Sequence, residues 1–480
     1  MMTIVGEYGL MGVMTVRSST RLIVRRRACR LLLTLALVVG VGCRSTDLLS
    51  VPPPPNLVGA GSLGDTTGAE AMRAGAIGEF ASALSGFPGA VQWTAMLSDE
   101  VRIGYNYSRP DVGIDARSLT ITGDGHTPFD GAYTTIQAAR LFSLQAAAAL
   151  ERRQSSTAAA EIGEVFALAA YSEILLGEAV CSGNPLSDLS PSGAPTYGVP
   201  LSTDSVFGRA LAHFDSATAH GGSDATVASL IAVGRGRALL DLGRFAEAGA
   251  VVTGVAPTFH YGTGPQVNTV RNFYQAWAGI NHRFFTVGDH KGVNGLDFVS
   301  ARDPRMVTIL QTTTAMGLPA YYPAKFPPST TTNDSIPLAD GVEAQLIGAE
   351  AALGAGNIAG WLGALNQLRA NFVALRGPYP ADTSYHQLGP LADPGSDSAR
   401  VSLTFRERAF WLYGTAHRLG DLRRLIRQYG RDQSTVFPSG PYDNGSGTVF
   451  YSTYGSSVTF PIGAIEAGNP NFHGCSSTQA

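Results

Sequence analysis

The fold is decided by the stretch DGVEAQLIGAEAALGAGNIAGWLGALNQLRANF, which runs from Asp340 to Phe372 in a chain of 480 residues. Small and apolar residues recur here at three- and four-residue steps, which is typical of amphipathic helices. Gly354 and Gly356 interrupt the pattern, and Asn357 can cap a following helix because its side-chain oxygen accepts the unpaired amides of the first turn. The stretch therefore predicts two helices joined by a tight turn.

An earlier stretch repeats this arrangement. ATVASLIAVGRGRALLDLGRFAEAGAVVTGV, from Ala225 to Val255, has two helical runs around a turn, with Gly243 as the predicted C-cap and small Ala248 packing against the preceding helix. Both stretches resemble tetratricopeptide (TPR) units, in which small residues let two antiparallel helices approach closely. Trp361 departs from that pattern, because TPR units usually carry Ala there. An isolated helical hairpin is the alternative for each stretch, but two of them favour a mostly α fold on a TPR-like scaffold.

Other segments show helical periodicity or lack it. Further helices are expected from about Gly68 onward, over Val91–Glu100, over Asp130–Arg152 and over Ala158–Ala179. Two segments, 257–334 and 377–399, are rich in aromatic, Gly and Pro residues and have weak periodicity. Loops of that length in a compact domain usually carry function, so we expect long irregular insertions that bind a ligand, chiefly near 257–334.

The N-terminus has the features of an export signal. Five arginines between Arg21 and Arg30 precede the apolar run Leu31–Val41 and then Gly42-Cys43. The cysteine resembles the end of a bacterial lipoprotein signal, which implies that residues 1–42 are removed and that Cys43 is lipidated; a plain signal peptide is the alternative. Residues 43–60 include four consecutive prolines and predict an extended tether between the lipid and the folded body.

Charge and cysteine usage exclude several functions. The formal net charge is −3, whereas nucleic-acid-binding surfaces must be basic, so we expect no nucleic-acid partner. Cys181 and Cys475 are the cysteines left after Cys29 and Cys43 are assigned to the signal and the anchor. An oxidising compartment permits a disulfide between them, and two free thiols are the alternative. They lack histidine partners at ligand spacing, so no metal site is expected.

The sequence also lacks catalytic signatures. There is no Gly-x-Ser-x-Gly elbow, His-Glu-x-x-His pair or phosphate-binding glycine loop. Asp99 and Glu100 are adjacent and would point in different directions, which makes them a poor catalytic pair for glycoside hydrolysis. His417 lies on an apolar helix and is interpreted as a hydrogen-bonded core residue. We expect no catalytic residue, no cofactor and no enzymatic activity.

A charged segment, FRERAFWLYGTAHRLGDLRRL from Phe405 to Leu425, precedes the C-terminal loops. Arg406, Glu407 and Arg408 are expected to begin an amphipathic helix. The later Arg418 and Asp421 can form ion pairs with neighbours three and four residues away, on what is usually a solvated helix face. An anionic sugar is the alternative partner for this basic cluster.

Taken together, four stretches resemble the SusD/RagB family. They are the cysteine and Pro/Asn segment at 43–56, the Trp93 and Ser98-Asp99-Glu100 stretch, the repeat-like segment 346–369, and the segment 405–425 with its Thr459-Phe460-Pro461-Ile462 ending. The resemblance implies one SusD-like domain over 61–480, anchored by lipid to the outer membrane and facing the exterior. It also implies binding of an oligosaccharide, or a peptide, and partnership with a SusC-like TonB-dependent barrel transporter.

Aromatic residues in the loops are the candidate ligand contacts, because sugar rings stack on Tyr and Trp while Asn and Arg bind the hydroxyls. The candidates are Tyr105, Asn106, Tyr107, Arg109, Tyr274, Trp277, Asn281, Arg283, Tyr321 and Tyr322. Burial in a loop core is the alternative for each. Two other functions are weighed against this one: a TPR-type scaffold for envelope assembly, which would not need the aromatic insertions, and a secreted glycoside hydrolase, which would turn over glycans.

Overall fold

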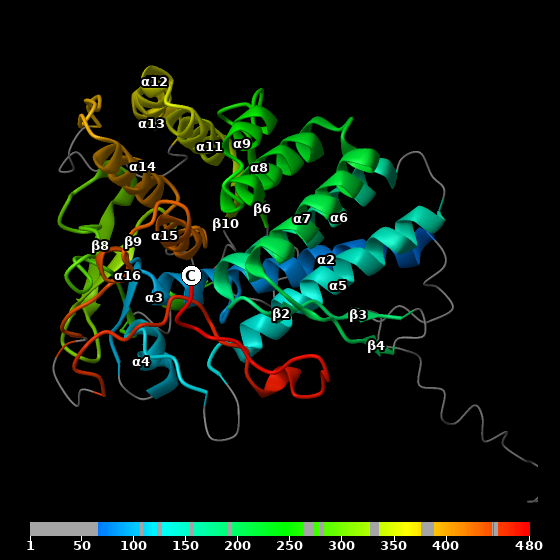
Figure 1. Cartoon of the computed structure of the whole chain (residues 1–480), viewed down its shortest axis with the longest axis horizontal. Coiled ribbons are helices and arrows are strands. Elements are labelled where there is room, and N and C mark those ends of the chain that lie inside the picture. The colour runs from blue at the N-terminus through cyan, green and yellow to red at the C-terminus, as the bar shows by residue number, and fades with distance from the viewer. Residues whose placement is uncertain are drawn as a thin grey trace, which may run out of the picture. The chain divides into compact units, whose positions relative to one another are not determined.

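Helices dominate the computed structural model, and its strands form only two-stranded sheets among the described residues (Figure 1). The structure describes residues 66–105, 109–121, 127–153, 158–190, 194–263, 273–278, 283–326, 336–375, 388–443, 445 and 450–480. Ala60–Ala480 form one compact unit. The expected signal peptide, the tether and Cys43 lie outside the described residues. Across the part of the chain that is described, no helix combines the length and apolar character needed to span a bilayer. The predicted mostly α fold is confirmed.

The helices pack side by side in a continuous series. Along this series each helix contacts the next, and the members are α2 (Thr66–Ser85), α5 (Asp130–Arg152), α6 (Ala159–Ala179), α7 (Thr203–Gly221), α8 (Ala225–Asp241), α9 (Phe245–Val251), α11 (Gly341–Gly354) and α12 (Ile358–Ala370). Gly163 and Gly221 lie where α6 and α7 meet, and a Cβ on Gly163 would fall 2.5 Å from the Gly221 Cα. The small residues therefore set the close approach of these two helices.

Both predicted helical hairpins are present. Gly243 has a φ of +70° at the turn between α8 and α9, and Gly356 has a φ of +71° between α11 and α12. Asn357 caps α12, because its side-chain oxygen accepts a hydrogen bond from the Gly360 amide at 2.9 Å. Ala248 is fully buried. The TPR-like interpretation of the two stretches is thus confirmed at the level of each hairpin.

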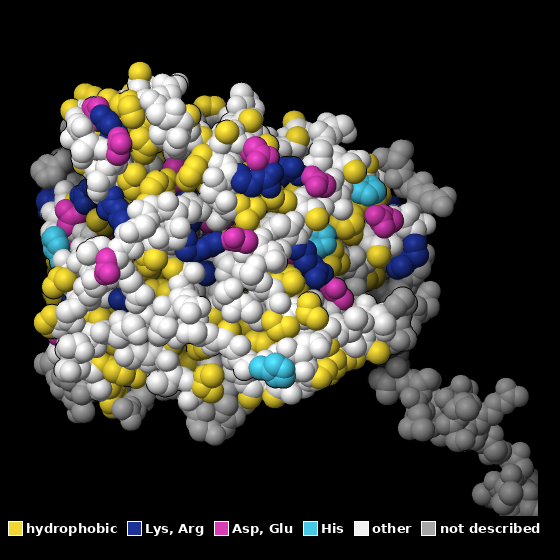
Figure 2. Space-filling view, in the orientation of Figure 1, with side chains coloured by type: hydrophobic (Ala, Val, Ile, Leu, Met, Phe, Trp, Pro, Cys, Tyr) yellow, Lys and Arg dark blue, Asp and Glu magenta, His cyan; other side chains and the backbone are white. Residues whose placement is uncertain are grey.

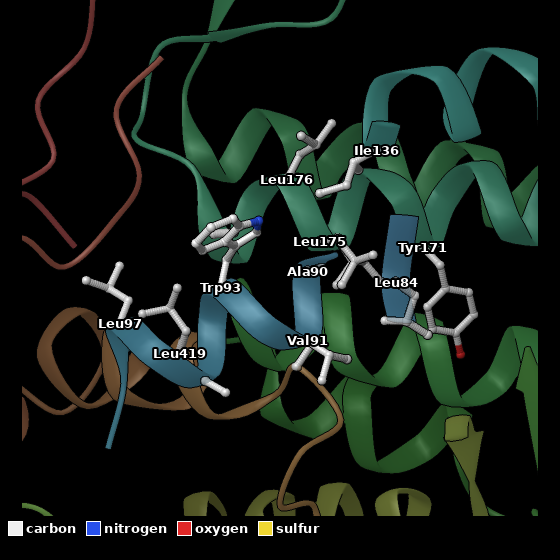
Figure 3. Packing of buried hydrophobic residues seen from close by; sticks show 14 of the residues in the cluster. Leu84, Ala90, Val91, Trp93, Leu97, Ile136, Tyr171, Leu175, Leu176 and Leu419 are labelled. Atoms are coloured by element: carbon white, nitrogen blue, oxygen red, sulfur yellow. The ribbon is translucent and has the colours of Figure 1, made fainter. Parts of the chain in front are cut away.

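Helix α3 (Ala90–Leu97) lies in the centre of the core. Figure 3 shows Ala90, Val91, Trp93 and Leu97 of α3 among apolar side chains of neighbouring helices, and the labelled neighbours are Leu84, Ile136, Tyr171, Leu175, Leu176 and Leu419. Every residue of α3 is buried. The helix ends at Leu97, so the predicted extension to Glu100 is wrong. Ser98 adopts an extended conformation and leads into strand β1 (Val101–Ile103).

The C-terminal helices α14 (Asp397–Trp411), α15 (Arg418–Arg427) and α16 (Gln433–Val436) complete the helical part. The expected ion pair between Asp421 and Arg424 forms, whereas Arg418 pairs with the distant Asp99. The expectation that a helix begins at Arg406 is wrong, because α14 begins at Asp397, and the expectation of a solvated helix face is wrong as well. Arg408 and Arg424 both bind the Asp421 carboxylate, and Arg424 also binds Glu350 of α11. These four side chains are buried. Buried charges are tolerated only when they are paired, so this network holds α11, α14 and α15 in one arrangement.

Most of the longer strands belong to a second, loop-rich part of the molecule. It contains the antiparallel pairs β1 with β7 (Phe285–Val287), β8 (Thr308–Thr313) with β9 (Pro319–Pro323), and β10 (Ile336–Asp340) with β6 (His260–Thr263). Shorter elements are α4 (Arg109–Asp115), α10 (Phe273–Ala278), α13 (Phe372–Leu375), β2 (Asn184–Pro185), β3 (Asp188–Leu189), β4 (Pro195–Thr196), β5 (Pro200–Leu201), η2 (Pro304–Met306) and η3 (Ala464–Glu466). The segment 257–334 therefore has more regular structure than its weak periodicity indicated.

A disulfide ties the C-terminal segment to the helices. Cys181, which follows α6, and Cys475 are joined, with their Cα atoms 5.8 Å apart. The same segment is held by backbone bonds, because the Phe460 amide donates to the Ala179 carbonyl at 2.8 Å and the Cys181 amide donates to the Phe460 carbonyl at 3.1 Å. Of the two states that the sequence left open for these cysteines, the structure contains the bridge.

Candidate functional site

Asp99 and Glu100 join the loop-rich part to the C-terminal helices. The Asp99 carboxylate accepts hydrogen bonds from Arg418 Nε at 2.6 Å and from the Leu296 amide at 3.0 Å. Burial alone would raise the pKa of Asp99, but the Arg418 guanidinium outweighs it and lowers that pKa. Glu100 Oε1 accepts a bond from the Gly414 amide at 2.8 Å. The two acids face different partners, as expected, and their role here is structural.

Glu100 is a buried carboxyl group that is protonated at neutral pH. It is 1% exposed, and burial raises its pKa to about 8. Its backbone carbonyl accepts a hydrogen bond from the Tyr413 hydroxyl at 2.8 Å. Through these contacts the end of α3 is bound to the turn before α15, which places β1 and the residues that follow it.

Six aromatic side chains form the core of the loop-rich part. They are Phe273, Tyr274, Trp277, Phe285, Tyr322 and Phe326, and we call them the insertion core. Tyr274 stacks on Phe326 with ring centroids 3.8 Å apart, and Trp277 meets Tyr322 edge-on at 5.6 Å. The Tyr274 hydroxyl donates to the Gly414 carbonyl at 3.2 Å. Gly414 has a φ of +73°, and a Cβ there would fall 2.1 Å from that hydroxyl, so only glycine fits.

Three of the predicted ligand contacts therefore need correction. Tyr274, Trp277 and Tyr322 are each at most 1% exposed. A ligand at the surface cannot reach them, and their rings instead pack against one another as the apolar core of the insertion. They hold the loops in place and do not bind the ligand.

Two other predicted residues, Tyr105 and Arg283, flank the paired strands β1 and β7. Tyr105 follows β1 and Phe284 precedes β7, so the β1–β7 pairing sets them side by side with ring centroids 5.1 Å apart. The Tyr105 hydroxyl donates to Asp111 Oδ2 of α4 at 2.8 Å. We refer to Tyr105, Asp111, Arg283 and Phe284 as the Tyr105 patch.

The Tyr105 patch combines apolar rings with polar groups. Tyr105, Phe284 and Asp111 are half-buried, and Arg283 is exposed. Burial, followed by the Asp111 carboxylate, raises the pKa of the Tyr105 hydroxyl, which therefore remains a hydrogen-bond donor at physiological pH. Arg283 Nε donates to the Thr313 carbonyl at 3.3 Å, and its terminal nitrogens have no hydrogen-bond partner among the described residues. The bond to Thr313 orients the guanidinium, whose terminal nitrogens are candidate donors to a ligand.

The other candidates are dispersed or outside the described residues. Tyr321 is half-buried on β9, where its amide donates to Thr286 Oγ1 at 3.0 Å. Asn106, Tyr107 and Asn281 lie outside the described residues, as does the side chain of Arg109. Their contribution to a ligand site stays a prediction.

Sequence reasoning missed Phe284 and Asp111. Phe284 is adjacent to Arg283, and Asp111 lies six residues after Tyr105, so both were near a predicted contact in the sequence. The missing signal was the pairing of β1 with β7. Its paired residues are 182 to 186 positions apart in the sequence, and only that pairing shows which aromatic residues become neighbours.

Other surfaces offer less for chemistry. His417 is buried and lies 3.0 Å from both Glu343 and Arg237, so its interpretation as a core histidine is confirmed. The described residues contain no group of three or more His, Cys, Asp or Glu side chains suited to a metal ion. On the face displayed in Figure 2, acidic and basic side chains lie next to one another among apolar ones. These observations leave the Tyr105 patch as the strongest candidate.

Known proteins were compared by sequence and by structure. No protein-family model and no curated protein matches the sequence. Solved structures do match. A SusD superfamily protein from Bacteroides vulgatus has a TM-score of 0.58 and 15% identity, and the match covers 86% of this chain and 99% of that one.

Two further solved structures extend this result. B. fragilis NanU has a TM-score of 0.55 and 13% identity, over 90% of this chain and 100% of its own. A SusD-like carbohydrate binding protein from Bacteroides vulgatus has a TM-score of 0.52 and 13% identity, over 75% of this chain and 83% of its own. The resemblance found in the sequence is therefore confirmed in the architecture: this chain has the fold of the SusD superfamily.

Proposed function

We propose that this protein binds an oligosaccharide reversibly at the Tyr105 patch, without a covalent step. The observation that carries the proposal is the ring contact of Tyr105 with Phe284, with the Asp111 carboxylate bound to the Tyr105 hydroxyl and the exposed Arg283 next to Phe284 in the chain. Sugar rings have apolar C–H faces that stack on aromatic side chains, while their hydroxyls need donors and acceptors at the rim. Phe284 and Tyr105 supply the faces, and Arg283 and Asp111 supply the polar contacts.

The fold supports the same proposal. One of the solved structures that share it is described as a SusD-like carbohydrate binding protein. The insertion core holds β7 in place from beneath, since Phe285 packs against Trp277 with ring centroids 5.8 Å apart. Because the support is rigid, the protein loses less conformational entropy when a ligand binds, which favours affinity.

Isothermal titration calorimetry with a panel of neutral and acidic oligosaccharides tests the proposal. For the glycan that binds, Tyr105→Ala should weaken affinity about tenfold or more, because it removes one stacking face. Tyr105→Phe should bind nearly as well as the native protein. The matched control is Tyr197→Ala, which removes an exposed tyrosine from the loop between β4 and β5. Equal affinity of Tyr105→Ala and the native protein would exclude this patch.

We further propose that the protein is a lipoprotein on the exterior of the outer membrane. Removal of residues 1–42 would leave Cys43 as the lipidated residue and 43–60 as a tether to the single domain. Metabolic labelling with a fatty-acid probe tests this: the native protein should be labelled, and Cys43→Ser should be unlabelled and released from membranes. Labelling of Cys43→Ser at the native level would contradict the anchor.

The proposed partner is a SusC-like TonB-dependent barrel transporter, to which the bound oligosaccharide passes for uptake. Support for this partnership comes from the SusD-superfamily fold and from the four sequence stretches that resemble the SusD/RagB family. Affinity purification of the lipidated protein from detergent extracts should recover a barrel transporter. Recovery of envelope-assembly proteins without a barrel would favour the TPR-scaffold alternative, and glycan turnover would favour a hydrolase.

A further inference from the structure

Lys291 has an unusually complete set of oxygen partners. Its ammonium donates hydrogen bonds to the backbone carbonyls of Met96, Ser98 and Val101, the last two at 2.8 and 3.1 Å. The Asp115 carboxylate lies 2.6 Å away. Lys291 is fully buried. We call these four oxygens the Lys291 cage.

The composition of the cage is that of a cation site. Backbone carbonyls and a carboxylate are the ligands that hard cations take in proteins. Two of the carbonyls come from the C-terminal end of α3, where unpaired carbonyls concentrate negative partial charge. The cage therefore attracts a positive charge, and the chain supplies that charge from its own side chain.

The backbone around Lys291 holds this side chain in the cage. On one side, the Gly288 amide donates to the Glu100 carbonyl at 2.7 Å. On the other side, the Asn294 side chain donates to the Phe437 carbonyl at 3.0 Å. Since the loop is attached at both ends, Lys291 is directed at the end of α3.

The cage is connected to the Tyr105 patch through Asp115. Its second carboxylate oxygen accepts hydrogen bonds from the Ile103 amide at 3.2 Å and from the Tyr442 hydroxyl at 2.8 Å. Ile103 ends β1 two residues before Tyr105, and Asp115 lies one helical turn after Asp111 on α4. Tyr105, the donor of the bond to Asp111, thus follows β1, and Asp111, the acceptor, lies on α4. Asp115 joins these two elements.

We propose that Lys291 is a tethered cation that positions the Tyr105 patch, and that its cage binds a free ammonium ion once the lysine is removed. The positioning role rests on the proposed function, whereas the cation site does not. Loss of the ammonium leaves Asp115 buried without its charged partner, which favours conformations in which β1 and α4 separate. If the ordered patch is populated about one tenth of the time, apparent affinity falls about tenfold.

Chemical rescue of Lys291→Ala tests the cage. This substitution removes atoms equivalent to propylammonium. Added propylammonium should therefore raise the Tm of the variant and restore its glycan affinity, and it should not raise the Tm of the native protein. Tetramethylammonium has the same charge but no N–H donors, and it should not rescue. Rescue by both ions, or by neither, would overturn the proposal.

Two further variants complete the test. Lys325→Ala removes a half-buried lysine, which donates to the carbonyls of Trp411 and Tyr413 and forms no ion pair among the described residues. Propylammonium should rescue this variant little. Asp115→Asn keeps a hydrogen-bond acceptor but removes the carboxylate charge. Propylammonium should therefore not rescue the double variant of Asp115→Asn with Lys291→Ala, and rescue of that variant would overturn the proposed cation site.

A variant that does not fold still leaves the proposal testable. Should Lys291→Ala be insoluble, Asp115→Asn alone should weaken glycan binding about tenfold by the same reasoning, and unchanged affinity would contradict the positioning role. Should the native protein bind no glycan, the proposed function fails, while rescue of the Tm by propylammonium still decides whether the cage is a cation site.

Discussion

Removal of the Cys181–Cys475 disulfide should destabilise the protein through its effect on the unfolded chain. The bridge spans 294 residues. In the chain-entropy model, opening a loop of that length costs about 5 to 6 kcal/mol of unfolding free energy, and the losses measured for native disulfides are about 2 to 5 kcal/mol. The backbone bonds around Phe460 remain in the folded state after the bridge is removed, so the folded structure should survive.

Cys475→Ser is the suitable perturbation, because it leaves the buried Cys181 as an apolar thiol and places the new hydroxyl at the half-buried position. Equilibrium urea unfolding, followed by tryptophan fluorescence and far-UV circular dichroism, should show a loss of about 3 to 5 kcal/mol. Native protein unfolded with a reductant present should match the variant. A loss below about 1 kcal/mol, or no effect of the reductant, would refute this reasoning.

Three further changes test other parts of the structure. Gly414→Ala should cost about 3 kcal/mol or more, because it adds a Cβ at positive φ against the Tyr274 hydroxyl, and thermal unfolding measures it. Trp277→Ala should cost about 3 to 5 kcal/mol of unfolding free energy, and in protein that remains folded it should weaken glycan binding less than Tyr105→Ala, because it loosens the support of β7 without removing a ring of the Tyr105 patch. Glu100→Gln should remove a pH dependence. The pKa of Glu100 is about 8 in the folded protein, so its stabilising contribution is complete below about pH 4.5 and is lost as the pH rises to 8. Over that pH interval the unfolding free energy of the native protein should fall by at most about 5 kcal/mol more than that of Glu100→Gln, as measured by urea unfolding at each pH. The same pH dependence in both proteins would contradict the burial of Glu100 as the cause.

The helical scaffold could be predicted because its signals are local. Small and apolar residues at helical spacing, with Gly243 and Gly356 at the turns and Asn357 as a cap, specify each hairpin within about 30 residues. The structure places α5 at Asp130–Arg152, the range that periodicity indicated. Helix α3 was predicted three residues too long because its end depends on Arg418 and Gly414, which are more than 300 residues away in the sequence.

Burial was harder to predict than secondary structure. Arg424 and Asp421 have the spacing of a solvated helix face, but α11 covers them and Glu350 neutralises the arginine. The aromatic residues of 257–334 occur in a segment without periodicity, so their composition fits a ligand site and a core equally well. Trp277 meets Tyr322 where α10 packs on β9, and Tyr105 meets Phe284 where β1 pairs with β7. One sequence does not reveal these long-range contacts.

A crystal structure of the protein with a bound oligosaccharide would show whether the Tyr105 patch is the binding site. In that structure a sugar ring should stack on Tyr105 or Phe284, with its hydroxyls hydrogen-bonded to Arg283 and Asp111. An oligosaccharide bound elsewhere on the protein, with the Tyr105 patch facing solvent, would contradict this prediction.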